Sequence, residues 1–253
     1  MQTKTKHISI IGFGRFGRLW ASLLKSDFQI TVCDSSPSAL EHAKSLGVEA
    51  VSQKDALAAE VIFYCLPISE FAITVALHAP ILQTMSNDKL LVDMLSVKMH
   101  AKETFEREID SGIQIMLSHP MFGPDSVEQS GLAGQRIMLE KFRTDDQTFI
   151  FWKDYFAKLK LEVIEMTAEE HDKQSASSQA LTHLVGRILQ KMHLSPSEID
   201  TSNSLKLQEI TEQVSRDELQ LFLDLQRYNP YTATMRQDFL RAQADLYKLI
   251  EDA

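Results

Sequence analysis

The 253-residue sequence has only two cysteines and no apolar run of 18 residues. The missing apolar run argues against a membrane-spanning helix. Cys33 and Cys65 both lie in strand-like apolar segments, so we expect buried, reduced thiols. No signal peptide is recognised, because "MQTKTK" leads directly into a strand-like segment. Internal repeats and low-complexity tracts are also missing, and together these features predict a cytoplasmic globular protein.

Positive charge is in short supply as well. The chain has 26 Lys and Arg against 35 Asp and Glu, which gives a formal net charge of −9. This balance argues against nucleic acid or an anionic membrane as the main partner, whereas a small anionic ligand needs only a local patch. Hydrophobic residues make up 44% and charged residues 24%, an ordinary globular composition that excludes general disorder.

Short apolar runs alternate with helical stretches over residues 7–167, which is the pattern of parallel βαβ units. Three of the runs are almost unbroken and predict strands buried on both faces of a sheet. The predicted strands are "HISIIGFG", "QITVCD", "EVIFYCLP", "KLLVDML" and "GIQIMLSHP", with "QRIMLEK" and "LEVIEM" as later additions to the same sheet. We therefore expect an α/β Rossmann-type domain with a mostly parallel sheet over residues 1–167.

The remaining residues, 168–253, show helical periodicity and no convincing strand, so they predict an all-helical domain. Within it, only residues 200–204 ("DTSNS") are predicted as a loop. The helical faces carry many apolar side chains, and pairing of two such domains in a homodimer would bury them. These side chains include Leu219, Leu221, Phe222, Leu223 and Leu225.

The segment "GFGRFG" places Gly12, Gly14 and Gly17 in G-x-G-x-x-G spacing between a predicted strand and a predicted helix. Asp34 ends the next strand about twenty residues later, as the dinucleotide fingerprint requires. Gly12 allows the tight turn, Gly14 the approach of a pyrophosphate and Gly17 the packing of helix on strand. The alternative is a glycine-rich turn that binds nothing.

The acid also bears on the choice of cofactor. Asp34 would accept hydrogen bonds from ribose hydroxyls and would repel a 2′-phosphate, so NAD is favoured. NADP stays open, since Ser35 and Ser36 would accommodate a phosphate if Asp34 turned away. The expected cofactor-binding residues are Gly12, Phe13, Gly14, Arg15, Phe16, Gly17, Asp34, Leu66, Pro67 and Ser96.

Two further polar residues follow the fourth and fifth predicted strands, Ser96 in "DMLSVK" and His119 in "SHPMFGP". Ligands of open parallel sheets bind beyond the carboxyl ends of the strands, so both are candidates for catalysis. Ser96 is alternatively the N-cap of the helix that follows, and His119 is alternatively a turn residue without a chemical role. Lys98 would meet an anionic substrate or be solvated. No metal site is expected.

In the helical domain, His171, Ser175, Gln179 and His183 recur every four residues and form a polar stripe along one helix. A stripe of Ser, Gln and His indicates a lined cavity, because a solvated stripe is usually Lys and Glu. Histidines at an interface between helices are the alternative.

Together, "GFGRFG", "DMLSVK", "SHPMFGPDS", "EEHD" and "SSQALTHLVGR" resemble the TyrA family of prephenate and arogenate dehydrogenases, and most of all its plant-type arogenate members. The resemblance implies a Rossmann domain followed by a helical dimerisation domain. It also implies NAD(P)-dependent oxidative decarboxylation of arogenate or prephenate in tyrosine biosynthesis. By the same resemblance, His119 is the base at the ring hydroxyl, Ser96 contacts that hydroxyl and the nicotinamide, and Gln179 and His183 face the substrate.

Two of the expected substrate contacts follow less directly from the resemblance. The arginine that binds the ring carboxylate in bacterial members has no certain counterpart, and Arg216 and Arg227 are the candidates, with Arg227 in our expected substrate set. Asp217 resembles a selecting acid of the plant-type enzymes, which would favour the ammonium of arogenate. Alternatively, residues 215–218 ("SRDE") form a capping box and Arg216 neutralises Asp217.

Two other functions remain compatible with a nucleotide-binding fold followed by helices. A β-hydroxyacid or 6-phosphogluconate-type dehydrogenase would use a lysine base on a helix and lacks "HPMFGP". A protein that senses NAD without turnover would not need Ser96 and His119 together.

Overall fold

The computed structural model describes residues 6–253 of the chain. The first five residues, which form most of the stretch on which the missing signal peptide rests, lie outside the described residues. The chain divides into two compact units, Met1–Ala168 and Glu169–Ala253, next to the boundary expected at residue 167. Within the described part of the chain, no helix combines the length and the apolar character that a bilayer crossing requires.

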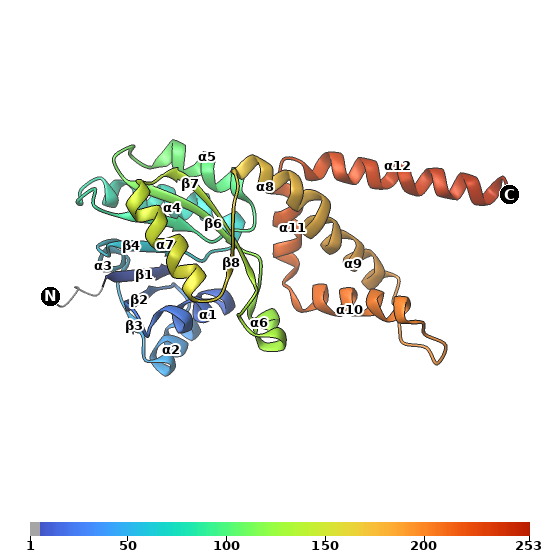
Figure 1. The fold of residues 1–253 in the computed structure, drawn as a ribbon, viewed down its shortest axis with the longest axis horizontal. Coiled ribbons are helices and arrows are strands. Elements are labelled where there is room, and N and C mark those ends of the chain that lie inside the picture. Colours follow the sequence, from blue (N-terminus) through green and yellow to red (C-terminus); the bar gives the residue numbers. More distant parts are fainter. Residues whose placement is uncertain (1–5) are drawn as a thin grey trace. The chain divides into compact units, whose positions relative to one another are not determined.

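The first unit is built on an eight-stranded sheet of order β3-β2-β1-β4-β5-β6-β7-β8 (Figure 1). All neighbouring strands run parallel except β6 and β7, which are antiparallel. The strands are β1 (His7–Ile11), β2 (Gln29–Cys33), β3 (Glu49–Ala50), β4 (Val61–Tyr64), β5 (Leu90–Asp93), β6 (Gln114–Pro120), β7 (Arg136–Arg143) and β8 (Glu162–Glu165). The expected mostly parallel sheet is confirmed, including its two late strands.

Helices cover both faces of this sheet, and the alternation of side chains along β4 shows how. Phe63 points to one face, where its ring meets Trp20 and Trp152 at centroid distances of 5.6 and 5.3 Å. Tyr64 points to the other, against Phe71 and Phe105 at 5.7 and 6.0 Å. The first face is thus packed by α1 (Arg15–Leu24) and α7 (Asp146–Lys158), the second by α4 (Ile68–Leu82) and α5 (Lys98–Glu108).

Local sequence signals set the ends of the connecting helices. Helix α2 has Pro37 in its first turn and ends at Gly47, whose φ of 71° is left-handed and suits glycine. The Asp145 side chain accepts the Thr148 amide and caps α7. The other helices of the unit are α2 (Pro37–Leu46), α3 (Gln53–Leu57) and α6 (Pro124–Ser130).

The order of strands fixes where a ligand meets the sheet. Strand β1 lies between β2 and β4 in the sheet. After β1 the chain adds β2 and β3 on one side of it, and then crosses to the other side of β1 with β4. Ligands of open α/β sheets bind at the carboxyl ends of the strands beside such a reversal. The turns after β1, β2, β4, β5 and β6 all lie at that edge, because these strands run in the same direction.

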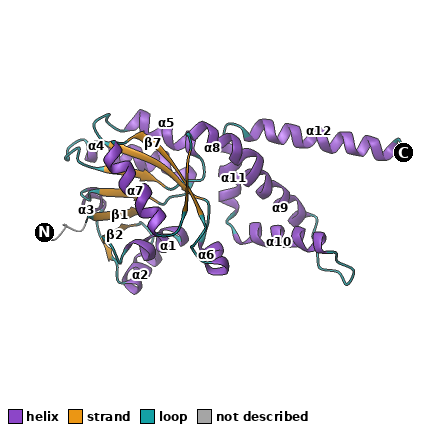
Figure 2. Cartoon of the chain, viewed as in Figure 1, coloured by secondary structure: helices purple, strands orange, loops and turns teal. Residues whose placement is uncertain are grey.

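The second unit contains helices and loops only (Figure 2). Helices α8 (Ala168–Ser175) and α9 (Leu181–Lys191) join without a break through η1 (Ala176–Ala180), a single π-helical segment. The unit continues with α10 (Ser202–Arg216), α11 (Leu219–Tyr228) and α12 (Thr232–Glu251). The all-helical character expected for this region is confirmed.

The loop predicted over residues 200–204 is wrong in its second half, because α10 begins at Ser202. The Thr201 hydroxyl accepts the Ser204 amide at 3.2 Å and caps the helix. Helices α9 and α10 then pack closely: a Cβ on Gly186 would lie 2.9 Å from a methyl group of Val214. A polar run read as a loop is therefore the start of a packed helix.

Some of the apolar side chains expected in this unit are buried by packing within the unit itself, and others stay exposed. Leu225 is fully buried, whereas Leu219 stays 58% exposed. Helix α12 is exposed throughout from Leu240 to its end, although this stretch carries Leu240, Leu246, Tyr247, Leu249 and Ile250. Large apolar side chains gathered on one exposed element indicate an interaction surface.

Candidate active site

The turn between β1 and α1 shows which of its glycines the fold itself demands. Gly12 has a φ of 89°, and a Cβ there would lie closer than 3.0 Å to the Cys65 carbonyl oxygen. A Cβ on Gly17 would approach the Gly12 carbonyl oxygen equally closely. Packing of α1 on the sheet therefore accounts for both residues without any ligand.

Gly14 differs, because a Cβ at this position would meet nothing within 4 Å, and the residue is exposed. It is the N-cap of α1 and has no side chain with which to cap the helix, and the first turn carries no acid. The first amides of a helix have no acceptor within it, and the helix dipole favours an anion at this end. The open backbone at Gly14 thus fits the pyrophosphate of a dinucleotide.

Asp34 lies at the end of β2, half-buried, with its carboxylate fixed by the backbone. It accepts the Phe13 amide at 2.6 Å and the Ser36 amide at 2.7 Å. Each oxygen retains a further lone pair, so the carboxylate can still accept ribose hydroxyls. The acid is thereby tied to the glycine turn itself.

The other residues expected to bind the cofactor differ in how exposed their side chains are. Phe13 is buried in the core, and the Phe16 ring stacks on Trp20 at 5.8 Å, so their side chains serve packing. Arg15 is exposed and forms an ion pair with Asp125 of α6.

After β4, Leu66 is half-buried and its Cδ2 lies 2.9 Å from where a Gly12 Cβ would stand. Pro67 is exposed and caps α4. Both residues therefore border the glycine turn, where they were expected to contact the cofactor.

His119 is the penultimate residue of β6 and is only 3% exposed. It faces Met138 of β7 in the sheet register, so the interpretation as a turn residue is wrong. Ser96 is half-buried three residues beyond β5. It is not the helix N-cap, because α5 begins at Lys98 with Val97 as its cap. Strands β5 and β6 are adjacent and parallel, so both residues lie at the carboxyl edge.

Both interpretations of Lys98 are wrong. The side chain is fully buried, pairs with the equally buried Asp93 and donates to the Ser118 carbonyl oxygen. The ammonium is therefore engaged inside the first unit and is not solvated. Sequence reasoning missed Asp93, although an acid at a strand end five residues before a lysine was visible.

In the second unit, the polar stripe is buried rather than solvated: His171, Ser175 and His183 are all buried and Gln179 is half-buried. The His171 Nδ1 lies 2.8 Å from an Asp172 carboxylate oxygen, and the Ser175 hydroxyl donates to Gln179 at 3.3 Å. His171, Ser175 and Gln179 thus have polar partners within their own helical segment. His183 is different.

The His183 Nε2 lies 3.7 Å from the Asp217 carboxylate, and its Nδ1 is buried with no hydrogen-bond partner among the described residues. Burial lowers the pKa of His183, the Asp217 charge opposes this, and the Arg187 guanidinium adds to it. A neutral imidazole with a buried, unused nitrogen can bind a polar ligand.

Asp217 lies between two helices, as the C-cap of α10, and Glu218 is the N-cap of α11. The capping box expected over residues 215–218 is therefore wrong, since Ser215 belongs to the last turn of α10. The Asp217 carbonyl accepts Arg187 at 2.6 Å. Sequence reasoning missed Arg187, which follows His183 by one helical turn, whereas the candidates Arg216 and Arg227 are both exposed.

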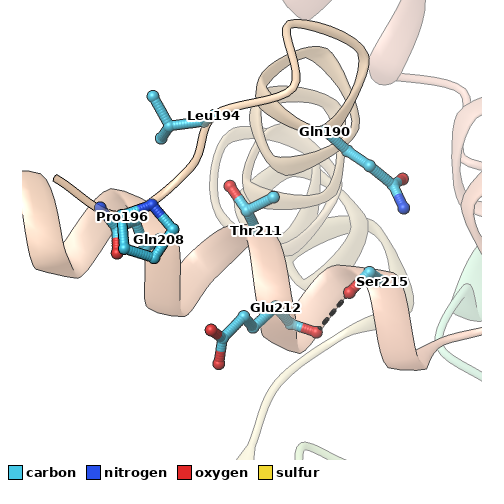
Figure 3. Close-up of a pocket in the computed structure, with 7 residues that line it drawn as sticks. All are labelled: Gln190, Leu194, Pro196, Gln208, Thr211, Glu212 and Ser215. Carbon is cyan, nitrogen blue, oxygen red and sulfur yellow. Dashed lines mark hydrogen bonds between the residues drawn. The ribbon is translucent and has the colours of Figure 1, made fainter.

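A small pocket of about 110 Å³ lies between α9, α10 and their connection (Figure 3). Its walls contain none of the expected site residues, and its Ser215 hydroxyl is already bonded to the Glu212 carbonyl at 2.8 Å. Sites for small organic ligands usually hold ~300 Å³ or more, so this pocket is too small for a ring substrate. No cluster of three or more metal-ligating side chains occurs within residues 6–253.

The strand order, the glycine turn and the acid after β2 define a dinucleotide-binding α/β protein. Residues 21–165 match the family described as prephenate dehydrogenase, nucleotide-binding domain, and the chain belongs to this family. The expected resemblance is confirmed, and so is a nucleotide cofactor for the first unit. Residues 188–252 match a family described as TYRAAT1-like, C-terminal domain.

Two similar proteins are arogenate dehydrogenases 1 and 2 of Arabidopsis thaliana, both named as chloroplastic. They are 32% and 29% identical over 234 residues, or 88% of this chain. The chain spans 36% and 64% of their respective lengths.

Solved structures show the same fold. Prephenate dehydrogenase from A. aeolicus, in complex with hydroxyphenyl propionate and NAD+, has a TM-score of 0.75 at 19% identity, covering 99% of this chain and 92% of that one. Arogenate dehydrogenase from Synechocystis reaches 0.71 at 18%, covering 97% and 92%. A Mycobacterium tuberculosis 3-hydroxyisobutyrate dehydrogenase reaches 0.55 at 15%, covering 91% and 94%, so the architecture alone does not separate these classes.

Two glycine substitutions should separate folding from cofactor binding. Gly14→Asp places a good N-cap where no atom is in the way, so stability is kept. Its carboxylate competes for the first-turn amides and repels the pyrophosphate, so NAD affinity should fall by about tenfold or more, as expected for ~1.4 kcal/mol. Gly17→Ala should instead destabilise the fold by about 1–3 kcal/mol through overpacking. Thermal unfolding and NAD titration followed by tryptophan fluorescence measure both; unchanged NAD affinity in Gly14→Asp would contradict the assignment.

Proposed function

We propose that the chain catalyses the NAD(P)-dependent oxidative decarboxylation of arogenate or prephenate, giving tyrosine or 4-hydroxyphenylpyruvate in tyrosine biosynthesis. The observation that carries this proposal is the placement of Ser96 and His119 at the carboxyl ends of adjacent parallel strands, at the same sheet edge as the glycine turn. Membership of the prephenate dehydrogenase nucleotide-binding family supports it, as do the relatives named arogenate dehydrogenases.

The proposed chemistry needs a base, a hydrogen-bonding group and orientation. An oxidised nicotinamide held at the glycine turn would supply the hydride acceptor for the ring carbon that bears the hydroxyl. His119 accepts the proton of that hydroxyl, a role for which a neutral imidazole is suited. Ser96 hydrogen-bonds the same oxygen. The ring carboxylate then leaves as carbon dioxide, its bonding electrons make the ring aromatic, and the phenolate oxygen takes back the proton held by His119; aromatisation supplies the driving force. The protein then contributes mainly orientation.

For the cofactor we propose NAD in preference to NADP. Asp34 is fixed by two backbone amides beside the glycine turn, and a 2′-phosphate would meet its negative charge. The relatives differ in this respect: the A. aeolicus structure contains NAD+, whereas a Schizosaccharomyces pombe relative, 26% identical, is named as a probable NADP+ enzyme.

For the substrate we propose Gln179, His183, Asp217 and Arg227 as contacts, with arogenate favoured. His183 and Asp217 lie 3.7 Å apart within the second unit, which supports their acting together. Arg227 is exposed, and Arg187, which donates to the Asp217 carbonyl, is an additional candidate for binding a carboxylate.

The alternatives are less well supported. A β-hydroxyacid-type enzyme would need a lysine base, and the buried stripe on α8–α9 contains two histidines, a serine and a glutamine instead. An NAD sensor without turnover would not require a serine and a histidine at the ends of neighbouring strands.

A turnover assay tests the proposal. The protein is mixed with arogenate or prephenate and with NAD or NADP, and absorbance near ~340 nm follows the reduced cofactor. We expect the fastest rise with arogenate and NAD. No rise with any of the four combinations would overturn the proposal, and turnover of a 3-hydroxyacid instead would favour the rival class.

We also propose a cytoplasmic location, with no membrane or nucleic-acid partner. Both cysteines are free, which is usual in a reducing compartment. The net charge of −9 disfavours polyanionic surfaces.

We further propose a homodimer formed through the helical region. Helix α12 carries Phe239, Ala242, Leu246 and Leu249 at i, i+3, i+7 and i+10, a seam of the kind that pairs helices. Leu246→Glu combined with Leu249→Glu should give a monomer, whereas Lys248→Glu on the same helix should stay dimeric. Light scattering at micromolar concentration gives the masses, and a monomeric wild type would refute the proposal.

Replacing the proposed base tests its role directly. His119→Asn should lower kcat by about 10²–10⁴-fold, the usual contribution of a general base. NAD affinity should barely change, because the glycine turn and Asp34 are untouched. Near-normal turnover at retained stability would rule out His119 as the base.

Substrate selection is tested at Asp217. Asp217→Asn should lower the preference for arogenate over prephenate by about tenfold or more, which corresponds to ~1.4 kcal/mol of lost attraction for the ammonium. Glu218→Gln, the exposed neighbour, is the matched control and should leave the ratio unchanged. The measurement is kcat/KM for both substrates, and an unchanged ratio in Asp217→Asn would remove this residue from substrate selection.

A further inference from the structure

The first unit contains a buried ion pair that the proposed chemistry does not use. Asp93 ends β5 and Lys98 begins α5, and both side chains are 0% exposed. They contact each other directly. The pair lies at the carboxyl edge of the sheet, where Ser96 and His119 also lie.

The pair is connected to the residue that precedes His119. The Ser118 amide donates to the Asp93 carboxylate at 3.1 Å, and the Ser118 carbonyl accepts from the Lys98 ammonium. The Ser118 hydroxyl donates to the Asp93 main-chain carbonyl at 2.6 Å. Every polar group of Ser118 is therefore bonded to Asp93 or Lys98.

In the sequence, Asp93 and Lys98 flank the segment that carries Ser96. Residues 94–97 lie between Asp93 and Lys98, and the Asp93 carboxylate also accepts the Leu95 amide at 3.3 Å. The regular ladder between β5 and β6 ends with Asp93 opposite Leu117. The ion pair therefore continues the connection between the two strands just beyond the point where backbone pairing stops.

Stability alone is a weak reason to keep such a pair. Removing two charges from water costs about as much as their attraction returns, and apolar residues of similar size are often as stabilising. Burial raises the pKa of Asp93, and the Lys98 ammonium opposes this. What an apolar pair would not provide is three directed side-chain contacts, two to Ser118 and one to Leu95.

We infer that Asp93 and Lys98 are positioning residues that fix the Ser96 segment relative to His119. They act through the Ser118 backbone and the ends of the 94–97 segment, and they touch neither substrate nor cofactor. This inference rests on the proposed function, because it concerns the geometry of the same two residues. It predicts that the pair affects the rate of the chemical step more than the binding of either ligand.

The test uses a double variant that removes both charges together. Asp93→Asn with Lys98→Met keeps an acceptor for the Ser118 amide and leaves no unpaired buried charge, so the protein should fold. Lys89→Met is the matched control. Lys89 is another buried lysine, and it precedes β5 at the opposite end, where its ammonium donates to the Ala59 carbonyl at 3.0 Å.

In the double variant, kcat should fall by about 10–100-fold, the effect of a displacement near 1 Å, with KM and the NAD dissociation constant within about threefold. Lys89→Met should keep kcat within about twofold, whatever its effect on thermal stability. Wild-type kcat in the folded double variant, or an equal loss of kcat in Lys89→Met, would overturn the inference.

Hydrogen exchange separates this inference from the proposed function. The double variant should exchange faster in residues 94–97 and 118–120, and Lys89→Met should not. If the wild type turns over none of the proposed substrates, the proposed function fails, yet faster exchange confined to these segments still supports the positioning role. Unchanged exchange in the double variant would overturn it independently of any activity.

Discussion

The close approach of α1 to the turn after β1 is the constraint on which the first unit depends. Gly12 and Gly17 have no room for a side chain, so the helix start is pressed against the carboxyl ends of β1 and β4. This contact directs the first amides of α1 toward the sheet edge. It also brings the Phe13 amide to Asp34, so that one packing contact places both the open helix end at Gly14 and the Asp34 carboxylate.

Apart from the two-residue strand β3, the strands and the order of units could be predicted from the sequence, because they depend on local signals. Unbroken apolar runs such as "VIFY" need cover on both faces, and Phe63 and Tyr64 indeed pack against different helices. The glycine fingerprint could be recognised because part of its spacing reflects a local contact, in which Gly17 packs against the Gly12 carbonyl five residues away. Proline and glycine at the ends of α2 were equally direct signals.

The surroundings of the site residues could not be read in this way. Lys98 near a helix start has the sequence context of a solvated lysine, and only the pairing of β5 with β6 brings Ser118 to it. The alternative that Asp217 starts a helix was wrong, because α10 continues to Arg216 and leaves the acid between two helices, beside His183. Ser118 and His183 each lie at least twenty residues from these side chains in the sequence, and periodicity carries no information about such distant partners.

The π-helical segment η1 sets the phase of the helix that runs from residue 168 to 191. A turn with i→i+5 hydrogen bonds holds one residue more than the α-helical pattern needs. Since each residue of an α-helix advances about 100° around the axis, this extra residue rotates everything after it relative to everything before. His171 and His183 therefore belong to two helical phases, and the packing of one half does not dictate the direction of the other. A deletion of one residue within 176–180 would restore a single phase and rotate α9, with His183, relative to His171 without changing either histidine.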